Sequence, residues 1–157
     1  MSNSKSILVV EHEPLIMELI VEVLGDEGYP VRTTASGLAA LNAIALDPPA
    51  LTLFDMWLPD LDARGLLAKL EAMGLSYLQL ILMTTSAQEA APLLILGTIS
   101  CLTKPFHIER LLALVADSMP SFPKPPNPHQ VSRLASRWSV TPGGPLRREN
   151  NFRYHQH

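Results

Sequence analysis

The chain has 157 residues, is 47% hydrophobic and 17% charged, and carries a formal net charge of −3. Its length suits one domain with an extension. No apolar run approaches the roughly 20 residues that a membrane span needs, and the opening "MSNSKS" does not begin a signal-peptide pattern. Cys101 is the only cysteine, which excludes an internal disulfide and a multi-cysteine metal site. We therefore expect a cytoplasmic protein without membrane contacts.

Charge divides the chain into two parts. Residues 1–119 carry 14 acids and 6 Lys/Arg, a net charge of −8, whereas residues 120–157 carry 1 acid and 6 Lys/Arg, a net charge of +5. Seven of the 14 prolines fall in the second part, where fixed φ angles and missing amide donors oppose regular structure. We expect one domain over 1–119 and a disordered basic tail over 120–157. The tail has no recognition-helix or zinc-finger pattern, so we do not expect a nucleic-acid partner, and only the tail could contact one.

Within the first part, short apolar runs alternate with longer segments of helical spacing. The expected strands are 6–11, 30–34, 50–55, 78–84 and 99–103. The expected helices are 14–26, 37–46, 64–74, 87–97 and 107–119. This alternation of strands and helices predicts a parallel sheet that is covered on both faces. Because crossover connections are right-handed, an open doubly wound α/β sheet is the leading architecture.

Local signals support several of these helices. Pro14 suits the first turn of the first helix, in which apolar residues recur at intervals of three and four while Glu18, Glu22 and Asp26 face away. Ser36 can cap the second helix. Pro92 interrupts the fourth helix, which is therefore the weakest.

Polar residues gather where the predicted strands end. The residues in question are Glu11, His12 and Glu13 after the first strand, Asp55 at the end of the third, Thr84, Thr85 and Ser86 at the fourth, and Lys104 after the fifth. Ligands of open α/β sheets bind at these carboxyl ends. Two carboxylates about 4 Å apart repel by about 4 kcal/mol at an effective dielectric constant near 20, so a cation should lie between them. A hard divalent ion and Lys104 are the candidates.

Four short motifs, taken together, resemble those of a known protein family. They are "ILVVEHEP", "FDMWLPDLD", the threonine after "LILM", and "TKPF", in this order. Over residues 5–119 the chain resembles the receiver domain of two-component response regulators. The resemblance implies a flavodoxin-like (βα)5 sheet with strand order 2-1-3-4-5. It also implies a regulatory phosphoacceptor, rather than an enzyme, that takes a phosphoryl group from a histidine kinase or phosphotransfer protein and signals to a downstream protein that the sequence does not identify.

The resemblance assigns roles to single residues. Asp55 is the implied phosphoacceptor, Lys104 holds the phosphoryl oxygens, and Thr84 supplies the hydroxyl that follows them, with Thr85 and Ser86 as competitors for that role. The Lys104–Pro105 bond is expected to be cis.

The same resemblance implies a Mg²⁺ site. Its ligands would be Glu11, the residue at position 12, Asp55 and the backbone carbonyl of Trp57. The family usually has a second acid at the position of His12. Because Mg²⁺ prefers oxygen ligands, His12 should weaken this site, admit a softer divalent ion, or act as a cation beside Glu11 and Asp55.

Two further positions depart from the family pattern. Cys101 occupies the position of the aromatic switch residue, and Ala63 replaces a customary glycine. A second hypothesis therefore stays open, in which a degenerate receiver binds a partner through its fourth and fifth helices without phosphorylation. A flavin carrier is disfavoured because "EHEP" would repel a phosphate, and a haloacid-dehalogenase-type phosphatase would need an acid where Trp57 stands.

Overall fold

The computed structural model describes residues 5–119 together with two short strands, Trp138–Ser139 and Arg147–Arg148. Strands and helices alternate along the chain. They are β1 (Ile7–Val10), α1 (Pro14–Asp26), β2 (Val31–Thr34), α2 (Gly37–Leu46), β3 (Leu51–Asp55), α3 (Ala63–Ala72), β4 (Gln79–Thr84), α4 (Ala87–Ala90), the 3-10 helix η1 (Ala91–Leu93), β5 (Ile99–Thr103) and α5 (Ile108–Ser118), followed by β6 (Trp138–Ser139) and β7 (Arg147–Arg148).

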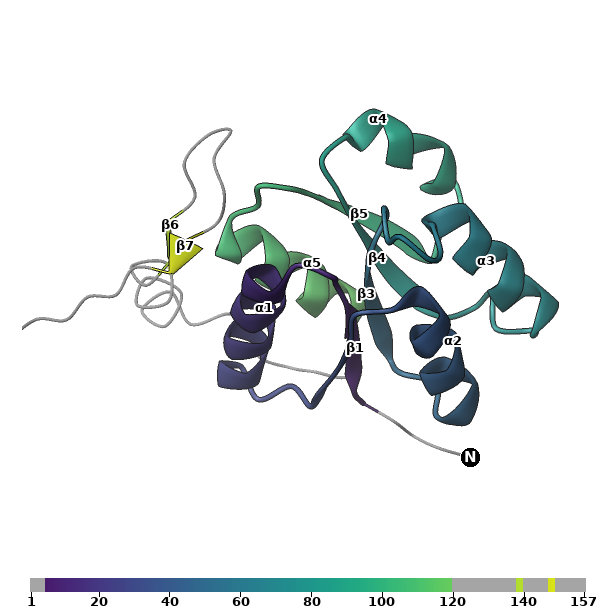
Figure 1. Ribbon diagram of the computed structural model, residues 1–157, viewed down its shortest axis with the longest axis horizontal. Helices are drawn as coiled ribbons and strands as arrows, with labels where there is room; N and C mark the ends of the chain where they lie inside the picture. The colour runs from purple at the N-terminus through teal and green to yellow at the C-terminus, as the bar shows by residue number, and fades with distance from the viewer. Residues whose placement is uncertain (1–4, 120–137, 140–146, 149–157) are drawn as a thin grey trace, which may run out of the picture.

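The first five strands form one parallel sheet in the order β2-β1-β3-β4-β5 (Figure 1). The predicted fold class and strand order are confirmed. Helices α1 and α5 pack on one face of this sheet, and α2, α3 and α4 pack on the other. Because β1, β3 and β4 are covered on both sides, their residues are mostly apolar and nearly all are buried.

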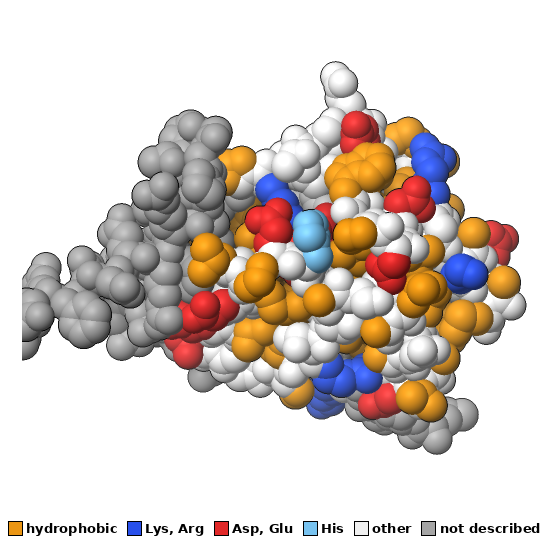
Figure 2. Space-filling model, viewed as in Figure 1, with side chains coloured by type: hydrophobic (Ala, Val, Ile, Leu, Met, Phe, Trp, Pro, Cys, Tyr) orange, Lys and Arg blue, Asp and Glu red, His pale blue; other side chains and the backbone are white. Residues whose placement is uncertain are grey.

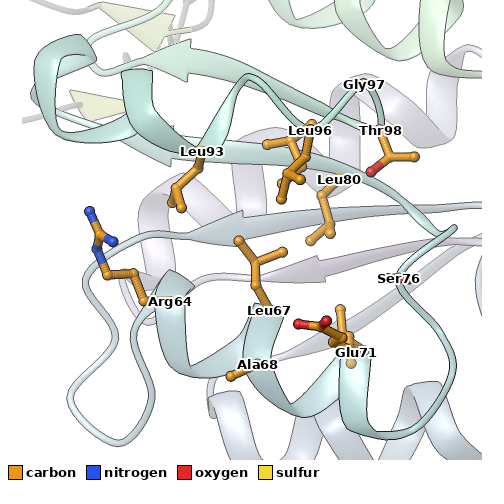
Figure 3. Close-up of a pocket in the computed structure, with 12 residues that line it drawn as sticks. Arg64, Leu67, Ala68, Glu71, Ser76, Leu80, Leu93, Leu96, Gly97 and Thr98 are labelled. Carbon is orange, nitrogen blue, oxygen red and sulfur yellow. The ribbon is translucent and has the colours of Figure 1, made fainter.

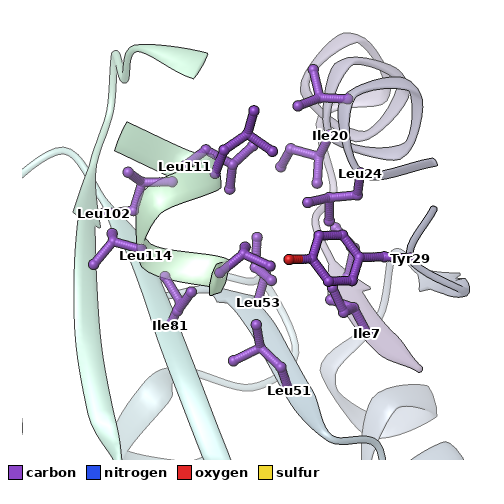
Figure 4. Packing of buried hydrophobic residues seen from close by; sticks show 14 of the residues in the cluster. Ile7, Ile20, Leu24, Tyr29, Leu51, Leu53, Ile81, Leu102, Leu111 and Leu114 are labelled. Carbon is purple, nitrogen blue, oxygen red and sulfur yellow. The ribbon is translucent and has the colours of Figure 1, made fainter. Parts of the chain in front are cut away.

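The core between the sheet and the α1–α5 layer consists mainly of aliphatic side chains, with the aromatic ring of Tyr29 among them (Figure 4). Ile20 and Leu24 of α1 face Leu111 of α5 across the strand residues Ile7 and Leu53. Fully burying one such side chain stabilises the fold by about 1.5–3 kcal/mol. The α1–α5 layer is therefore held to the sheet along its length, with the acidic side of α1 left outward.

Helix starts follow the predicted signals. Pro14 occupies the first turn of α1, and the Ser36 hydroxyl caps α2 by accepting a hydrogen bond from the Ala39 amide at 3.3 Å. Asp62 caps α3 through the Gly65 amide at 2.8 Å.

The fourth helix is much shorter than the predicted 87–97. It ends at Ala90 and continues only as the 3-10 turn of η1, because Pro92 has no amide hydrogen and its ring opposes a continuing α-helix. The chain then passes through Leu94, Ile95 and Leu96, which are 37%, 86% and 49% exposed.

A groove of about 570 Å³ lies between α3 and the segment that joins η1 to β5 (Figure 3). Its apolar lining includes Leu67, Leu80 and Leu93, with Arg64 and Glu71 of α3 at its wall. The strand residues Leu80 and Ile99 line this groove and remain buried, at 3% and 7% exposure.

Beyond residue 119, β6 and β7 pair antiparallel, with Trp138 opposite Arg148 and Ser139 opposite Arg147. The expected disorder of 120–157 otherwise falls outside the described residues. Nowhere in the described part of the chain is a helix both long enough and apolar enough to cross a membrane.

Candidate functional site

The carboxyl ends of β1, β3 and β5 bring four predicted site residues together. Because parallel strands end at one edge of the sheet, Glu11, Asp55 and Lys104 converge although they are far apart in sequence. His12 follows Glu11 and points to the same place. We call Glu11, His12, Asp55 and Lys104 the site cluster.

Glu11 and Lys104 form the most buried contact of the cluster. The Lys104 ammonium donates to Glu11 Oε2 at 2.7 Å, while the Glu13 amide donates to Glu11 Oε1 at 3.1 Å. The Glu11 side chain is fully buried, and this burial raises the pKa of its carboxyl group; Lys104 opposes that rise and the charge of Asp55 adds to it. The Lys104 ammonium therefore compensates a carboxylate that would be costly to bury alone.

Asp55 lies at the end of β3 and is 4% exposed. Its Oδ1 accepts a hydrogen bond from the Trp57 amide at 3.1 Å. Its Oδ2 lies 2.7 Å from His12 Nδ1 and 3.7 Å from Lys104 Nζ. Asp55 is thus a buried carboxylate that faces one ammonium group and one imidazole.

His12 contacts both carboxylates with the same nitrogen. Nδ1 lies 2.7 Å from Asp55 Oδ2 and 3.5 Å from Glu11 Oε1, and the side chain is 41% exposed. The distance to Asp55 is that of a strong hydrogen bond, in which an N–H of the ring donates to the carboxylate. The three roles predicted for His12, which are a weakened Mg²⁺ site, a site for a softer ion and a cation beside the two acids, stay predictions; the structure places its ring beside both carboxylates.

Thr84 and Cys101 are not drawn into the cluster. The Thr84 hydroxyl accepts from the Ser86 amide at 3.0 Å and donates to the Ser86 carbonyl at 3.3 Å, so it closes a local turn. Thr84 still adjoins Lys104, because its carbonyl accepts from the Lys104 amide at 2.7 Å. Cys101 packs against the core on the α2–α3–α4 side, and burial raises the pKa of its thiol. The Lys104–Pro105 peptide bond is cis.

The loop after Asp55 is fastened by a residue that sequence reasoning missed. Asp60 accepts hydrogen bonds from the amides of Gly37 and Leu38 at 3.0 Å each and from the Ser36 hydroxyl at 2.8 Å. These donors lower the pKa of Asp60 to about 2. No local motif marks this contact, since the carboxylate and the start of α2 are more than 20 residues apart in sequence.

Close packing completes the attachment of this loop. A side chain on Gly37 would come 2.6 Å from Leu61 Cβ, and one on Gly65 would come 2.8 Å from Leu61 Cδ1. Leu61 therefore sits between two glycines that let α2 and α3 approach the loop. Asp55 is held by a loop with little room to move.

The cluster is a candidate metal centre with mixed ligands. One ligand atom each from Glu11, His12 and Asp55 lies within 4.8 Å of the others. Mg²⁺ prefers six oxygen ligands, however, and each carboxylate oxygen already faces a protein donor. The set does not fit Mg²⁺ well, and its imidazole is better suited to a borderline divalent ion.

The surface around the cluster is apolar at several points. Leu15 at the start of α1, Leu38 at the start of α2 and Trp57 after β3 are 44%, 52% and 50% exposed. Figure 2 shows a histidine on this face with acidic and basic side chains beside it and hydrophobic ones around it. The groove in Figure 3 is lined by none of the four cluster residues.

Comparisons with known proteins agree with this architecture. The family model of the response regulator receiver domain matches residues 7–116. Sporulation initiation phosphotransferase F of Bacillus subtilis is 31% identical over 125 residues, which cover 76% of this chain and 97% of that protein. The sensor histidine kinase RcsC of Salmonella typhi is 31% identical over 117 residues, but only 12% of its length is covered.

Two other comparisons extend this likeness. The transcriptional regulatory protein KdpE of Mycobacterium tuberculosis is 30% identical, with 68% of this chain and 47% of that protein covered. This chain therefore spans about half or less of several curated relatives. The receiver domain of NtrX from Brucella abortus superposes with a TM-score of 0.67 at 28% identity, covering 74% of this chain and 99% of that one.

A response regulator from Chloroflexus aurantiacus superposes with a TM-score of 0.68 at 26% identity, over 75% of this chain and 99% of that structure. Receiver domains generally bind Mg²⁺ through acidic residues, so the imidazole at position 12 is a departure within a shared fold. On the family match, the strand order and the relatives of matching length, the chain belongs to the response regulator receiver domain family.

Proposed function

We propose that this receiver accepts a phosphoryl group on Asp55 from a histidine kinase or a phosphotransfer protein. The observation that carries the proposal is the position of Lys104, whose ammonium lies 3.7 Å from Asp55 Oδ2 at the open edge of the sheet. A relative whose length is almost fully covered is named a sporulation initiation phosphotransferase, which supports a role in a phosphorelay.

The transfer is a displacement at phosphorus. An Asp55 oxygen attacks the phosphorus of a phosphohistidine donor, the O–P bond forms, the P–N bond breaks, and the departing imidazole takes up a proton. Such a transfer needs positioning and positive charge more than covalent help from the protein. Lys104 can supply that charge once its contact with Glu11 loosens, and Thr84 is next to it at the end of β4.

The contacts within the cluster favour a slow reaction. His12 donates to the carboxylate that must attack, and Lys104 is already bonded to Glu11. Interactions that stabilise the ground state more than the transition state lower the rate. We therefore expect Asp55 to accept a phosphoryl group slowly, because His12 stabilises its unreacted carboxylate and Lys104 is bonded to Glu11.

Metal dependence should be weaker than in a receiver with two adjacent acids. His12 occupies the place of a charged oxygen ligand, so Mg²⁺ loses both a suitable atom and a negative charge. A borderline divalent ion could use the imidazole together with Glu11 and Asp55. No step of the proposed transfer is assigned to a metal ion.

The second candidate function is a receiver that binds its partner without phosphorylation. The 2.7 Å contact between His12 and Asp55 favours this alternative, because it satisfies the carboxylate without an incoming group. In this alternative the surface of the fourth and fifth helices would bind the partner, as the sequence suggested.

Intact-mass measurement separates the two functions. The protein is incubated with acetyl phosphate, with and without Mg²⁺, beside Asp55→Asn as the matched control. The proposal expects a gain of one phosphoryl group that is slow in the wild type and absent in the variant. No gain in either protein would favour the phosphorylation-independent module, and equal gain in both would place the acceptor elsewhere.

A further inference from the structure

One side of α3 carries two opposite charges. Arg64, Leu67, Ala68 and Glu71 all line the groove of Figure 3, and their spacing puts them on one side of the helix. We call these four residues the α3 stripe. Arg64 and Glu71 are exposed and lie two turns apart, beyond the spacing of three or four residues at which side chains pair on a helix. Neither takes part in an ion pair with another described residue.

These two charges are arranged against the dipole of their own helix. Arg64 lies in the first turn of α3, where the positive end of the dipole disfavours a cation. Glu71 lies in the last turn, where the negative end disfavours an anion. Beside a second helix that runs in the opposite direction, each charge would face the end of the neighbouring dipole that stabilises it. The pattern is therefore unfavourable in one helix and favourable in an antiparallel pair.

The α3 stripe is also complementary to a second copy of itself. Leu67 and Ala68 lie midway between the two charged residues, so a two-fold axis at this point would bring Arg64 of each copy to Glu71 of the other. Ala68 contributes only a methyl group at the centre, and small side chains at a contact let two helices approach closely. The stripe thus meets the symmetry that an isologous dimer requires.

Apolar surface adjoins the stripe across the groove. Leu94, Ile95 and Leu96 are consecutive and exposed, and Leu96 lines the groove on the side opposite α3 (Figure 3). Their exposure follows from Pro92, which ends the fourth helix before it can carry these residues. A contiguous exposed apolar segment with charged residues beside it is typical of a protein–protein contact.

We propose that two copies of this chain associate through the α3 groove, with their α3 helices antiparallel and the segment 94–96 of each copy covered at the same interface. Exposed ion pairs contribute little individually, so the apolar segment supplies the affinity while the charges select the antiparallel orientation. The groove is lined by none of the site cluster residues, so this association does not require phosphorylation of Asp55.

The test measures the oligomeric state of the full chain. Sedimentation velocity is recorded from about 5 to about 500 µM protein, over which mass action converts a weak dimer from mostly dissociated to mostly associated. We expect the average mass to rise from 17.2 kDa toward twice that value at about 50 mM NaCl, and to rise less at about 500 mM NaCl because salt screens exposed charges. A mass that stays monomeric at every concentration would overturn the proposal.

Charge reversal tests the predicted pairs. R64E and E71R each set like charges against each other at both ends of the interface, so each should raise the dissociation constant about tenfold or more. K69E changes the net charge as R64E does, on an exposed residue of α3 outside the stripe, and should raise it less than about threefold. R64E/E71R exchanges the charges and should recover association. Equal effects of R64E and K69E would overturn the proposal.

A mixture of the two single variants tests the symmetry of the contact. The stripe of R64E carries two acids and that of E71R carries two bases, so an equimolar mixture should form a heterodimer although each variant alone stays largely monomeric. Both substitutions are at exposed positions and place charges that the α3 dipole favours, so both proteins should fold. Absence of association in the mixture would overturn the antiparallel arrangement.

The apolar segment has a matched control in Leu46. Ile95 is 86% exposed beside the groove, and Leu46 is 87% exposed at the end of α2 and outside it. I95S should raise the dissociation constant about tenfold, because burial of this side chain at the interface is lost, whereas L46S should leave it unchanged. Equal weakening by both variants, or weakening by neither, would overturn the proposal.

Discussion

The two sides of the site cluster offer different things to an incoming phosphoryl group. On the β5 side, the Lys104 ammonium lies 3.7 Å from Asp55 Oδ2 and adjoins the end of β4, where Thr84 is located. On the β1 side, His12 occupies the place where an acid would bind a metal ion, and it bonds Asp55 directly. In the proposed function, the β5 side would favour transfer to Asp55, whereas the contact on the β1 side stabilises the unreacted Asp55 carboxylate. We therefore expect the balance between the two sides to separate the two functions proposed above, which are slow acceptance of a phosphoryl group and binding without phosphorylation.

The largest effect on stability and labelling should come from removing the Lys104 ammonium on the β5 side. Lys104→Ala leaves the buried Glu11 without its cation, and removing one partner of a buried ion pair costs about 3–5 kcal/mol. Because the Lys104 side chain retains 12% exposure, we expect the low end of that range, about 3 kcal/mol, in urea unfolding. Labelling of Asp55 by acetyl phosphate should be lost.

Two variants separate stability from chemistry here. Lys69→Ala, on an exposed position of α3, should change neither quantity. The double variant Glu11→Gln/Lys104→Met removes both charges, so it should recover most of the stability but none of the labelling. Recovery of labelling in the double variant would contradict the role of Lys104 as the cation for the phosphoryl group.

The second-largest effect should come from replacing His12 on the β1 side with an acid. His12→Asp adds a third carboxylate beside Glu11 and Asp55, so the variant should be less stable than the wild type in the presence of a chelator. Mg²⁺ at about 100 times its dissociation constant should then add about 2.7 kcal/mol if only the folded state binds it. Thermal unfolding during a Mg²⁺ titration measures this gain, and the wild type should show much less.

His12→Asn is the matched control for that experiment, because it removes the imidazole without adding charge. It should remain weakly responsive to Mg²⁺, whereas His12→Asp should also label faster with acetyl phosphate. An equal Mg²⁺ response in wild type and His12→Asp would place position 12 outside the metal site.

Much of this molecule could be predicted from the sequence, because its strongest signals are local. Apolar runs placed the five strands to within a residue or two, and the shared edge of parallel strands placed Glu11, Asp55 and Lys104 together. The length of the fourth helix was wrong, since the effect of Pro92 outweighed the apolar spacing after it.

The rest depends on choices that a linear pattern does not contain. The sequence leaves the direction of the His12 side chain open, and the structure places its Nδ1 2.7 Å from Asp55 Oδ2. The Thr84 hydroxyl turns to Ser86 rather than to Lys104, because a local turn competes for it. Asp60 contacts the start of α2 across more than 20 residues of sequence, so no local pattern contains this contact.

The smallest expected effect concerns Asp60. Replacing it tests whether the loop after Asp55, rather than the Lys104 and His12 side chains, causes the difference between the β5 and β1 sides of the site cluster. Asp60→Ala removes the acceptor for two amides of α2 and should lower the free energy of unfolding by about 1 kcal/mol, as for other helix caps.

The folded-state pKa of Asp60, about 2, lies below its ordinary value of 3.8, so the native state binds fewer protons than the unfolded chain. The stabilisation should therefore be complete above pH 4, decline as the pH falls toward 2, and be lost below it. Urea unfolding of wild type and variant at pH 7, 3 and 2 measures the decline. A difference in stability that is unchanged at pH 2 would show that the carboxylate charge is not what holds the loop, and altered Mg²⁺ response in Asp60→Ala would show that the loop, not His12, weakens the β1 side.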